Sequence, residues 1–261
     1  MSIIDVSGNQ GTIDWVAMKA DGVTHAWVKA TEGATWSDPM YSRNMREARR
    51  AGVKPGSYHY ARPDNNSPAA EVAHFLKTMI LTNGVYVWQG DPLPALDFEA
   101  PEAQHMGAAT LSAWAHEFLT ILAANIHCPP LFYSYPAYIQ GALGGGSDSL
   151  RKWPLWLAAY GPNDGAAHPV TPPAGFLNTV AHQYTSQGRV AGRYPIDMNR
   201  PYHKIEDILV PRLKPPLPPV TEKRFQALRR WIRARREEGW SWRRIKASAN
   251  WREFLRALKD R

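Results

Sequence analysis

Residues 93–101, LPALDFEAP, are the stretch that decides the fold. Leu96 and Phe98 alternate with Asp97 and Glu99, and the period of two in an extended strand places both carboxylates on one face. Two acids that share one small space cannot both ionise cheaply, so we expect at least one raised pKa and a protonated carboxylic acid near neutral pH. Such a group can donate a proton to a leaving oxygen. The alternative is an ordinary strand with one solvated face.

Short apolar runs alternate with helical patterns on both sides of this stretch. The runs that predict strands are residues 2–6, 23–30, 53–61, 93–99, 131–135, 155–160, 179–185 and 194–198. Helical patterns cover residues 13–19, 39–51, 68–80 and 110–125, and Asp38 is expected to cap the second of them. Repeated strand and helix units predict an α/β fold, a parallel (β/α) barrel with eight strands. Because helical patterns fade after residue 125, we expect an incomplete barrel.

A barrel of this kind makes a prediction about where chemistry lies, since its active residues project from the carboxyl ends of strands. Polar residues end or follow the predicted strands repeatedly: Asp5, Lys29 and Glu32, Tyr60 and Arg62, Asp97 and Glu99, Tyr133 and Tyr135, Tyr160, Gln183 and Tyr184, and Asp197 with Asn199. One acid at one strand end is usually a helix cap or a solvated loop residue. Acids at several strand ends, interleaved with Tyr and Trp, are typical of a carbohydrate cleft.

Length and composition limit the possible folds and classes of protein. The 261 residues allow one large barrel or two smaller units, and 11 Trp, 11 Tyr and 7 Phe describe an ordered protein with ring-lined surfaces. A single cysteine, Cys128, excludes an internal disulfide. The opening residues MSIIDVSGNQG lack the pattern of a secretory signal, and no segment reaches about 18 charge-free apolar residues. We therefore expect no transmembrane segment and a protein made in a cytoplasm.

The charge is unevenly distributed along the chain. Residues 219–261 hold 14 Lys and Arg against 5 Asp and Glu, whereas residues 1–218 hold 17 basic and 18 acidic residues. The net charge of +8 therefore arises entirely in the last part of the chain. Together with the proline-rich stretch PRLKPPLPP, this asymmetry predicts a large unit at residues 1–212, a linker at residues 213–220 and a basic module at residues 221–261.

The basic module is predicted to be a small all-α domain. Thr221, Ser241 and Asn250 are expected to start three short helices that bury their Trp and Leu side chains together and expose Arg. Such a face attracts anionic cell-wall polymers or a membrane surface, which is the interpretation we favour. A helix-turn-helix-like contact with nucleic acid and a merely solvated bundle are the alternatives, and we expect no nucleic acid.

Six blocks of the sequence, in family order, resemble those of a glycoside hydrolase family 25 muramidase, a Chalaropsis-type lysozyme common among phage endolysins. They are DVSGNQG at 5–11 with IDW at 13–15, VKATEG at 28–33, GSYHY at 56–60, LDFE at 96–99, LWLAAY at 155–160, and HQY at 182–184 with IDMN at 196–199. The resemblance covers about residues 1–212. It implies a flattened barrel of eight strands with fewer helices than strands, and cleavage of the β-1,4 bond between N-acetylmuramic acid and N-acetylglucosamine in peptidoglycan.

The resemblance also implies roles for the acids. The second acid of the Asp-x-Glu block is the proton donor of the family, which falls on Glu99, and Asp97, Asp5 and Asp197 complete the acidic site. We expect the negative charge of Asp97 to keep the proton on Glu99, and Asp97 itself to stay ionised. For the second half of the reaction we favour attack by the acetamido oxygen of the substrate with retention, Asp97 or Asp197 orienting the acetamido N–H. The alternative makes Asp197 a covalent nucleophile.

Other residues are expected to bind substrate. Tyr58, Tyr60, Tyr133, Trp156 and Tyr184 are candidates to stack on sugar faces or to donate hydroxyl hydrogen bonds, and for each the alternative is a core ring. Lys29 and Glu32 are expected to form an ion pair near the acids, or simply to end their strand. Gln183 offers a donor and an acceptor for an acetamido group.

Several classes of chemistry are not indicated. The nine histidines follow no His-Glu-x-x-His or paired Cys and His spacing, so we expect no metal site and no cofactor. The expected partner is bacterial peptidoglycan, acted on after release of a protein made in the host cytoplasm, and we expect a monomer. The alternative for the whole chain is a non-catalytic peptidoglycan-binding module whose basic tail binds wall polymer or nucleic acid.

Overall fold

The computed structural model describes residues 2–211, 230, 234–235, 237–238 and 240–241. The chain divides into two compact units, Met1–Arg212 and Leu213–Arg261, of which the first carries every element discussed below. The predicted linker at residues 213–220 and most of the predicted helical module at residues 221–261 lie outside the described residues. In the described part of the chain, no helix has the length and apolar character needed to cross a lipid bilayer.

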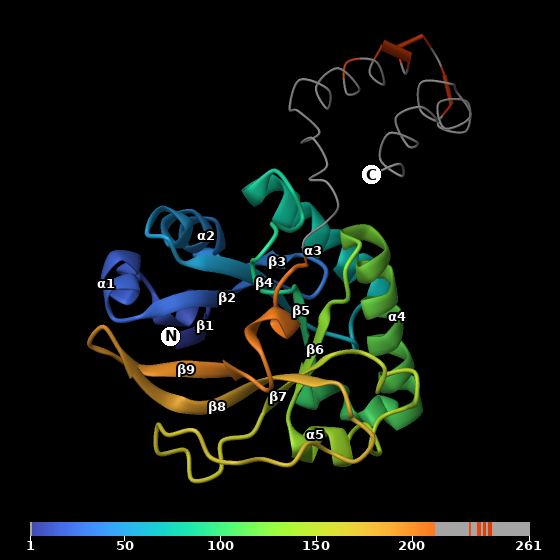
Figure 1. Ribbon diagram of the computed structural model, residues 1–261. Coiled ribbons are helices and arrows are strands. Elements are labelled where there is room, and N and C mark those ends of the chain that lie inside the picture. The colour runs from blue at the N-terminus through green and yellow to red at the C-terminus, as the bar shows by residue number, and fades with distance from the viewer. Residues whose placement is uncertain (1, 212–229, 231–233, 236, 239, 242–261) are drawn as a thin grey trace. The chain divides into compact units, whose positions relative to one another are not determined.

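The first unit is built on a closed ring of eight strands (Figure 1). In ring order these are β1 (Ser2–Val6), β9 (Arg193–Pro201), β8 (Thr179–Val190), β7 (Leu155–Ala158), β6 (Leu131–Ser134), β5 (Ala95–Asp97), β4 (Lys54–Tyr60) and β2 (Val23–Glu32). Parallel pairing of β1 with β2 closes the ring. A two-residue strand that the sequence analysis missed, β3 (Trp36–Ser37), folds back on the end of β2 outside the ring. The predicted eight-stranded barrel is confirmed.

The expectation that all strands run parallel is wrong for β9. This strand runs antiparallel to both of its neighbours, β1 and β8. Only Ala191 and Gly192 separate β8 from β9, with φ of 50° and 72°, the backbone of a tight hairpin turn. A parallel connection needs a crossover of a dozen or more residues, so a two-residue link enforces the antiparallel direction.

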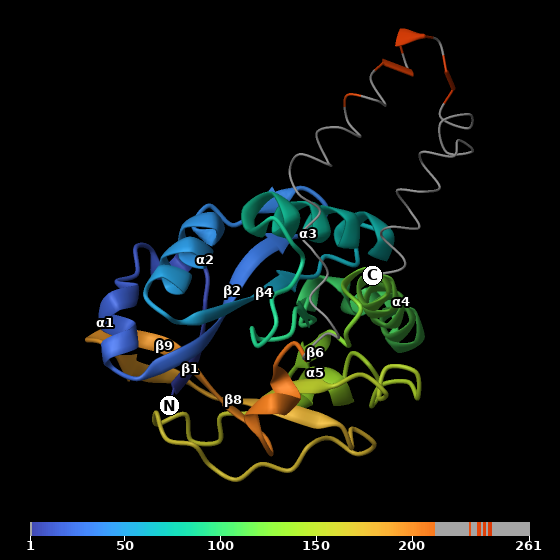
Figure 2. The same cartoon turned by 45° about the horizontal axis from the view of Figure 1, so that its top comes forward.

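Helices cover only part of the ring. The α-helices are α1 (Trp15–Ala20), α2 (Tyr41–Arg50), α3 (Pro68–Asn83), α4 (Ala108–Ile126) and the short α5 (Pro136–Gln140), joined by the 3₁₀ turns η1 (Gly8–Gln10), η2 (Pro101–Met106) and η3 (Ile205–Ile208). In both ribbon views α3 and α4 lie side by side against the sheet (Figures 1 and 2). Residues 159–178, between β7 and β8, contain no helix. The prediction of an incomplete helical layer is therefore confirmed, although α5 was not foreseen.

Side-chain caps explain the starts of two of the five α-helices in the described residues. The Asp14 side chain accepts the Ala17 N–H at the start of α1, and Ser67 accepts the Ala70 N–H before Pro68 at the first position of α3. The prediction for Asp38 was wrong, because α2 begins at Tyr41 with no side-chain cap. Asp38 is instead buried, and its carboxylate accepts the N–H groups of Met40 and, at 2.7 Å, of Gly8. It fixes the turn η1 at the edge of the barrel.

Aromatic rings fill the interior of the barrel. Trp27 on β2 stacks on Trp156 on β7 with ring centroids 4.2 Å apart, and both rings are buried. The Trp27 Nε1–H donates to the Leu93 carbonyl oxygen at 2.9 Å, so its one polar atom is satisfied. The interior of the barrel is therefore packed with side chains, and Trp156 also lines the cavity described below.

Candidate active site

One cavity of about 310 Å³ opens at the carboxyl edge of the parallel strands and holds all four predicted acids. Asp5 comes from β1, Asp97 is the last residue of β5, Glu99 follows it, and Asp197 lies in β9. Asp197 reaches this edge because β9 runs in reverse and pairs with β1 so that Asp197 lies opposite Asp5. The prediction that Asp197 ends a strand is wrong, although the residue does line the cavity.

The alternation of residues 96–99 positions the central pair as predicted. Leu96 and Phe98 are fully buried, and Phe98 stacks with Trp114 of α4 at 5.7 Å. The extended backbone continues past β5, because Phe98 N–H donates to Tyr133 O at 3.0 Å and Phe98 O accepts the Ser134 hydroxyl at 2.9 Å. With Phe98 anchored on the helical side, Asp97 and Glu99 face the cavity.

Two side-chain amides hold Asp5. Its Oδ1 accepts a hydrogen bond from Gln183 Nε2 at 2.9 Å and another from Asn199 Nδ2 at 2.7 Å. Gln183 and Asn199 sit opposite each other on β8 and β9, so the hairpin that reverses β9 also assembles this pair of donors. Both amides are buried, and the carboxylate is fixed in one orientation.

The amides are themselves oriented by aromatic residues. The hydroxyls of Tyr133 and Tyr160 donate to Gln183 Oε1 at 2.9 and 2.7 Å, and the Trp156 indole N–H donates to Asn199 Oδ1 at 2.8 Å. The oxygen of each amide therefore accepts hydrogen bonds from aromatic side chains, and its nitrogen donates a hydrogen bond to Asp5. Such polarised chains favour the charged form of the acid at their end.

Burial changes the acidity of all four carboxyls. Burial raises the pKa of Asp5 to about 6, while its hydrogen bonds to Asn199 and Gln183 lower it. Burial, together with the charge of Asp5, raises the pKa of Glu99 to about 7, against an opposing effect of Lys29. Burial and the charges of Asp5 and Glu99 raise the pKa of Asp197 to about 8. Protonated carboxylic acids therefore exist here at neutral pH, and they can donate a proton to a substrate oxygen.

The expectation that Asp97 stays ionised does not hold. Burial and then the charge of Glu99 raise the pKa of Asp97 well above its usual range. Its Oδ1 is buried and has no hydrogen-bond partner within the described residues, so only the nearby charge of Lys29 opposes the rise in pKa. The pKa of Asp5, about 6, is lower than those of Glu99 and Asp197, so Asp5 is the first of these three acids to ionise as the pH rises.

An ion-paired network flanks the acids. Lys29 lines the cavity and donates to Glu32 at 2.7 Å, while Arg62 donates to the other oxygen of Glu32 from Nε at 2.8 Å and Nη2 at 2.6 Å. The Tyr60 ring lies near both cations, 4.8 Å from Lys29 Nζ and 5.1 Å from the Arg62 guanidinium carbon. The predicted pair of Lys29 and Glu32 is confirmed.

The structure brings some of the remaining predicted residues into the cavity and leaves others outside it. Of the residues predicted to bind substrate, those that line the cavity are Lys29, Tyr58, Tyr60, Tyr133, Trp156 and Gln183. Glu32 and Tyr184 do not line it. Strand alternation explains why Tyr184 lies outside the cavity. Gln183 faces the cavity, so the next residue of β8, Tyr184, faces away from it. The Tyr184 ring lies instead beside His182, with centroids 6.2 Å apart.

Five further residues of the cavity were not predicted to bind substrate: Ser7, Asn9, Gln10, Val6, and Tyr160, which was named only as a residue at a strand end. The first three belong to η1 and its cap, where the Ser7 hydroxyl accepts the Asn9 N–H and the Gln10 side chain accepts the Ser7 N–H. The sequence carried a signal for this turn, since Ser7 and Gln10 have the Ser-x-x-Gln spacing of a capping box. Among the described residues, no cluster of three or more His, Cys, Asp or Glu side chains is arranged to hold a metal ion.

The chain is similar in sequence to known proteins. Residues 4–193 match the family profile described as glycosyl hydrolases family 25. The chain is 31% identical over 194 residues to Lysozyme M1 of Streptomyces globisporus, covering 72% of this chain and 63% of that protein. It is 28% identical over 167 residues to a lysozyme of Streptococcus phage Cp-9, covering 63% of this chain and 45% of that protein. The chain thus spans less than two thirds of the length of these relatives.

A solved structure has the same fold. The crystal structure of the bacterial lysozyme from Streptomyces coelicolor superposes with a TM-score of 0.69 at 28% identity. The superposition covers 80% of this chain and 94% of that one.

Proposed function

The chain belongs to glycosyl hydrolases family 25, and from this membership and its own acid cavity we propose that it is a muramidase. The reaction is hydrolysis of the β-1,4 bond between N-acetylmuramic acid and N-acetylglucosamine in peptidoglycan. The observation that carries the proposal is the meeting of Asp5, Asp97, Glu99 and Asp197 in one cavity at the carboxyl edge of the barrel. Glycoside cleavage needs one protonated acid at the glycosidic oxygen and one ionised group near the oxocarbenium-like centre.

Glu99 is the proton donor in this proposal. It is less buried than Asp97, and its pKa of about 7 leaves it partly protonated near neutral pH while still able to release the proton. Asp5 supplies the ionised group, because its two amide donors stabilise the carboxylate. The glycosidic C–O bond breaks as the Glu99 proton passes to the leaving oxygen.

We propose that the acetamido oxygen of the muramic acid attacks C1 as that bond breaks. The Glu99 carboxylate then takes a proton from the water that opens the intermediate, and the configuration at C1 is retained. The raised pKa of Asp197, about 8, supports this course, since a neutral carboxylic acid is a poor nucleophile. Asp97 or Asp197 orients the acetamido N–H. A covalent glycosyl adduct on Asp197 would contradict the proposal.

The products of digestion test the cleavage site. Peptidoglycan digested by the protein, reduced with borohydride and analysed by mass spectrometry is expected to carry reduced muramic acid at the new chain ends. Reduced glucosamine at those ends would show a glucosaminidase, and no new reducing ends would favour a non-catalytic binding module. NMR of the first-formed anomer, recorded during the digestion and before reduction, tests retention.

We also propose that residues 221–261 draw the enzyme to the anionic polymers of the cell wall. The support is the count of 14 basic against 5 acidic residues from residue 219 onward. Deletion of residues 220–261 is expected to leave cleavage of small soluble fragments unchanged and to slow lysis of whole cells several-fold, most strongly at low salt. Equal lysis by both forms, or retention of residues 219–261 on duplex DNA in preference to purified walls, would contradict this role.

A lytic role in phage infection is part of the same proposal. It is supported by the similarity to the phage Cp-9 protein and by the succession of a hydrolase barrel, a proline-rich stretch and a basic segment. In this role the enzyme reaches the wall from the host cytoplasm after release.

A further inference from the structure

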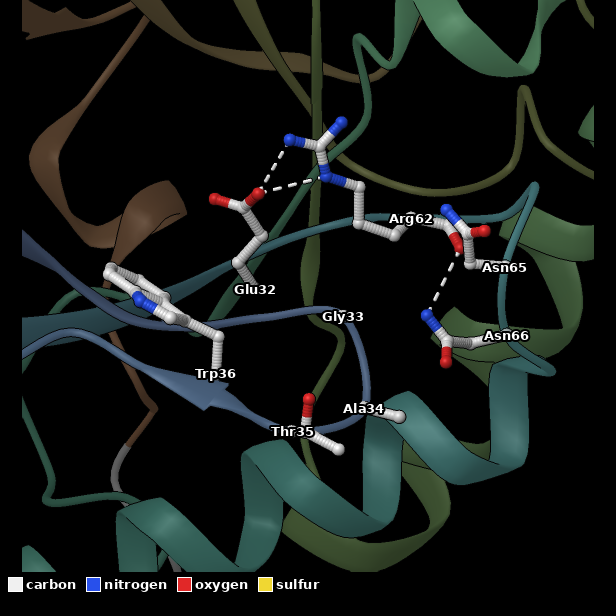
Figure 3. A pocket seen from close by; sticks show the side chains of 8 residues that line it. All are labelled: Glu32, Gly33, Ala34, Thr35, Trp36, Arg62, Asn65 and Asn66. Atoms are coloured by element: carbon white, nitrogen blue, oxygen red, sulfur yellow. Dashed lines mark hydrogen bonds and ion pairs between the residues drawn. The ribbon is translucent and has the colours of Figure 1, made fainter.

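A second hollow, which we call the side pocket, has a volume of about 530 Å³ and is larger than the acid cavity. It lies between the turn that joins β2 to β3 and the turn that joins β4 to α3 (Figure 3). Its lining residues are Glu32, Gly33, Ala34, Thr35, Trp36, Arg62, Asn65 and Asn66. Both turns follow the carboxyl ends of their strands, so the side pocket lies on the same edge of the barrel as the acids.

The wall between the two hollows is the ion-paired network. Lys29 lines the acid cavity and is bonded at 2.7 Å to Glu32, which lines the side pocket. Arg62, also of the side pocket, lies 5.1 Å from the ring centre of Tyr60, which lines the acid cavity. An extended chain bound over the acids would cross Tyr60 and this network to reach the side pocket.

The side pocket has the chemistry of a sugar site. The indole of Trp36 is 45% exposed at its rim, and the amides of Asn65 and Asn66 lie across from it with the Arg62 guanidinium (Figure 3). An exposed ring packs on the apolar face of a pyranose, while planar amides bond its hydroxyl and acetamido groups.

Charge argues for a neutral occupant. The Arg62 guanidinium is already paired with Glu32 and, at 3.1 Å, with Glu102. Its positive charge is therefore compensated within the protein. A carboxylate of a stem peptide would have to compete with two fixed carboxylates for this group, whereas a neutral sugar would not.

Buried groups beneath the side pocket fix its shape. Glu71 on α3 is fully buried and accepts the Arg62 N–H at 3.1 Å and the Asn66 Nδ2 at 3.0 Å. His59 holds the other side of this carboxylate at 2.7 Å. Gly33 has a φ of 56°, and a Cβ there would lie 3.2 Å from Asn66 Nδ2, so the two turns are closely packed. A site that is already ordered loses less conformational entropy when a ligand binds.

We propose that the side pocket is an accessory subsite for a further N-acetylglucosamine of the glycan chain that is cut in the acid cavity. This inference rests on the proposed function. It predicts that the enzyme prefers long chains, since a short chain fills the acid cavity and leaves the side pocket empty.

The test uses peptide-free alternating oligosaccharides of N-acetylglucosamine and N-acetylmuramic acid with four and eight sugars. Wild-type kcat/KM is expected to be higher for the octasaccharide. The Trp36→Ala variant is expected to lose about tenfold on the octasaccharide and less than twofold on the tetrasaccharide. The matched control is Trp88→Ala, which removes an equally exposed Trp outside both hollows and is expected to change neither value.

Three outcomes would overturn the subsite. These are an equal loss on both substrates, no loss on either, and a loss that appears only when stem peptides are attached, which would indicate a peptide occupant. Calorimetric titration of the two oligosaccharides into the wild type and Trp36→Ala gives a readout independent of turnover. If the wild type cleaves neither substrate, the muramidase proposal fails, while tighter octasaccharide binding that requires Trp36 still supports the side pocket.

Discussion

Replacement of Glu99 by Gln is expected to lower kcat on purified peptidoglycan by about 10³-fold. The amide has nearly the same shape as the acid but cannot pass a proton to the leaving oxygen. Burial and the charge of Asp5 give Glu99 a pKa of about 7, so the wild-type side chain holds a transferable proton near neutral pH. The measurement is the initial rate of reducing-end release, with the loss of turbidity of a wall suspension as a second readout.

The matched control for this variant is Glu117→Gln. Glu117 is an exposed residue of α4, and its replacement makes the same chemical change away from the cavity. Thermal unfolding and far-UV circular dichroism establish that both variants fold. Activity of Glu99→Gln within tenfold of the wild type would mean that the proton comes from another group. Asp97→Asn would then be the next variant to assay, because Asp97 also has a strongly raised pKa.

Raising the pH from 6.5 to 8.5 is expected to lower the free energy of unfolding by about 3 kcal/mol. The pKa of Glu99 is about 7 and that of Asp197 about 8 in the folded protein, whereas exposed carboxyls titrate near pH 4. In this window the unfolded chain is already ionised and the folded chain still holds protons. Stability that is fully present below the unfolded pKa is therefore lost as the pH rises through the folded values.

Histidine opposes this loss in part. Burial lowers the pKa of His25, His59 and His182 in the folded protein, whereas histidines of the unfolded chain titrate near pH 6.5. Each of these groups therefore adds about 0.4 kcal/mol of stability between pH 6.5 and 8.5. Urea unfolding at several pH values measures the slope. Asp197→Asn is expected to remove about 2 kcal/mol of the loss, because the raised pKa values of Asp97, Glu99 and Asp91 also contribute to it. The control Asp148→Asn changes a side chain that is 95% exposed and is expected to keep the slope.

A wild-type stability that stays constant between pH 6.5 and 8.5 would contradict this account. It would mean that the cavity acids ionise as exposed carboxyls do, and that the proton on Glu99 is not a consequence of burial. The side chains that bury the cavity would then have no part in setting its acidity.

The sequence alone determined the barrel and the placement of three of the four acids of its site, Asp5, Asp97 and Glu99. The strict alternation of residues 96–99 needs only the period of an extended chain, and both acids line the cavity as that period requires. The eight apolar runs became the eight strands of the ring because each is bounded by turn-forming residues. Asp5 was placed correctly by the same local rule, since it ends its run at the carboxyl edge.

The tertiary structure alone decided the direction of β9, the state of each acid and the side pocket. Asp197 reaches the cavity because a two-residue turn reverses its strand, so its position depends on pairing with β1 and not on the end of a run. Burial raises the pKa of Glu99, Asp97 and Asp197, while the pKa of Asp5 is lowered by donors such as Gln183, 178 residues away from it in the chain. Periodicity records which face a side chain takes within its own strand, whereas desolvation and charge depend on neighbours that only the closed ring brings together.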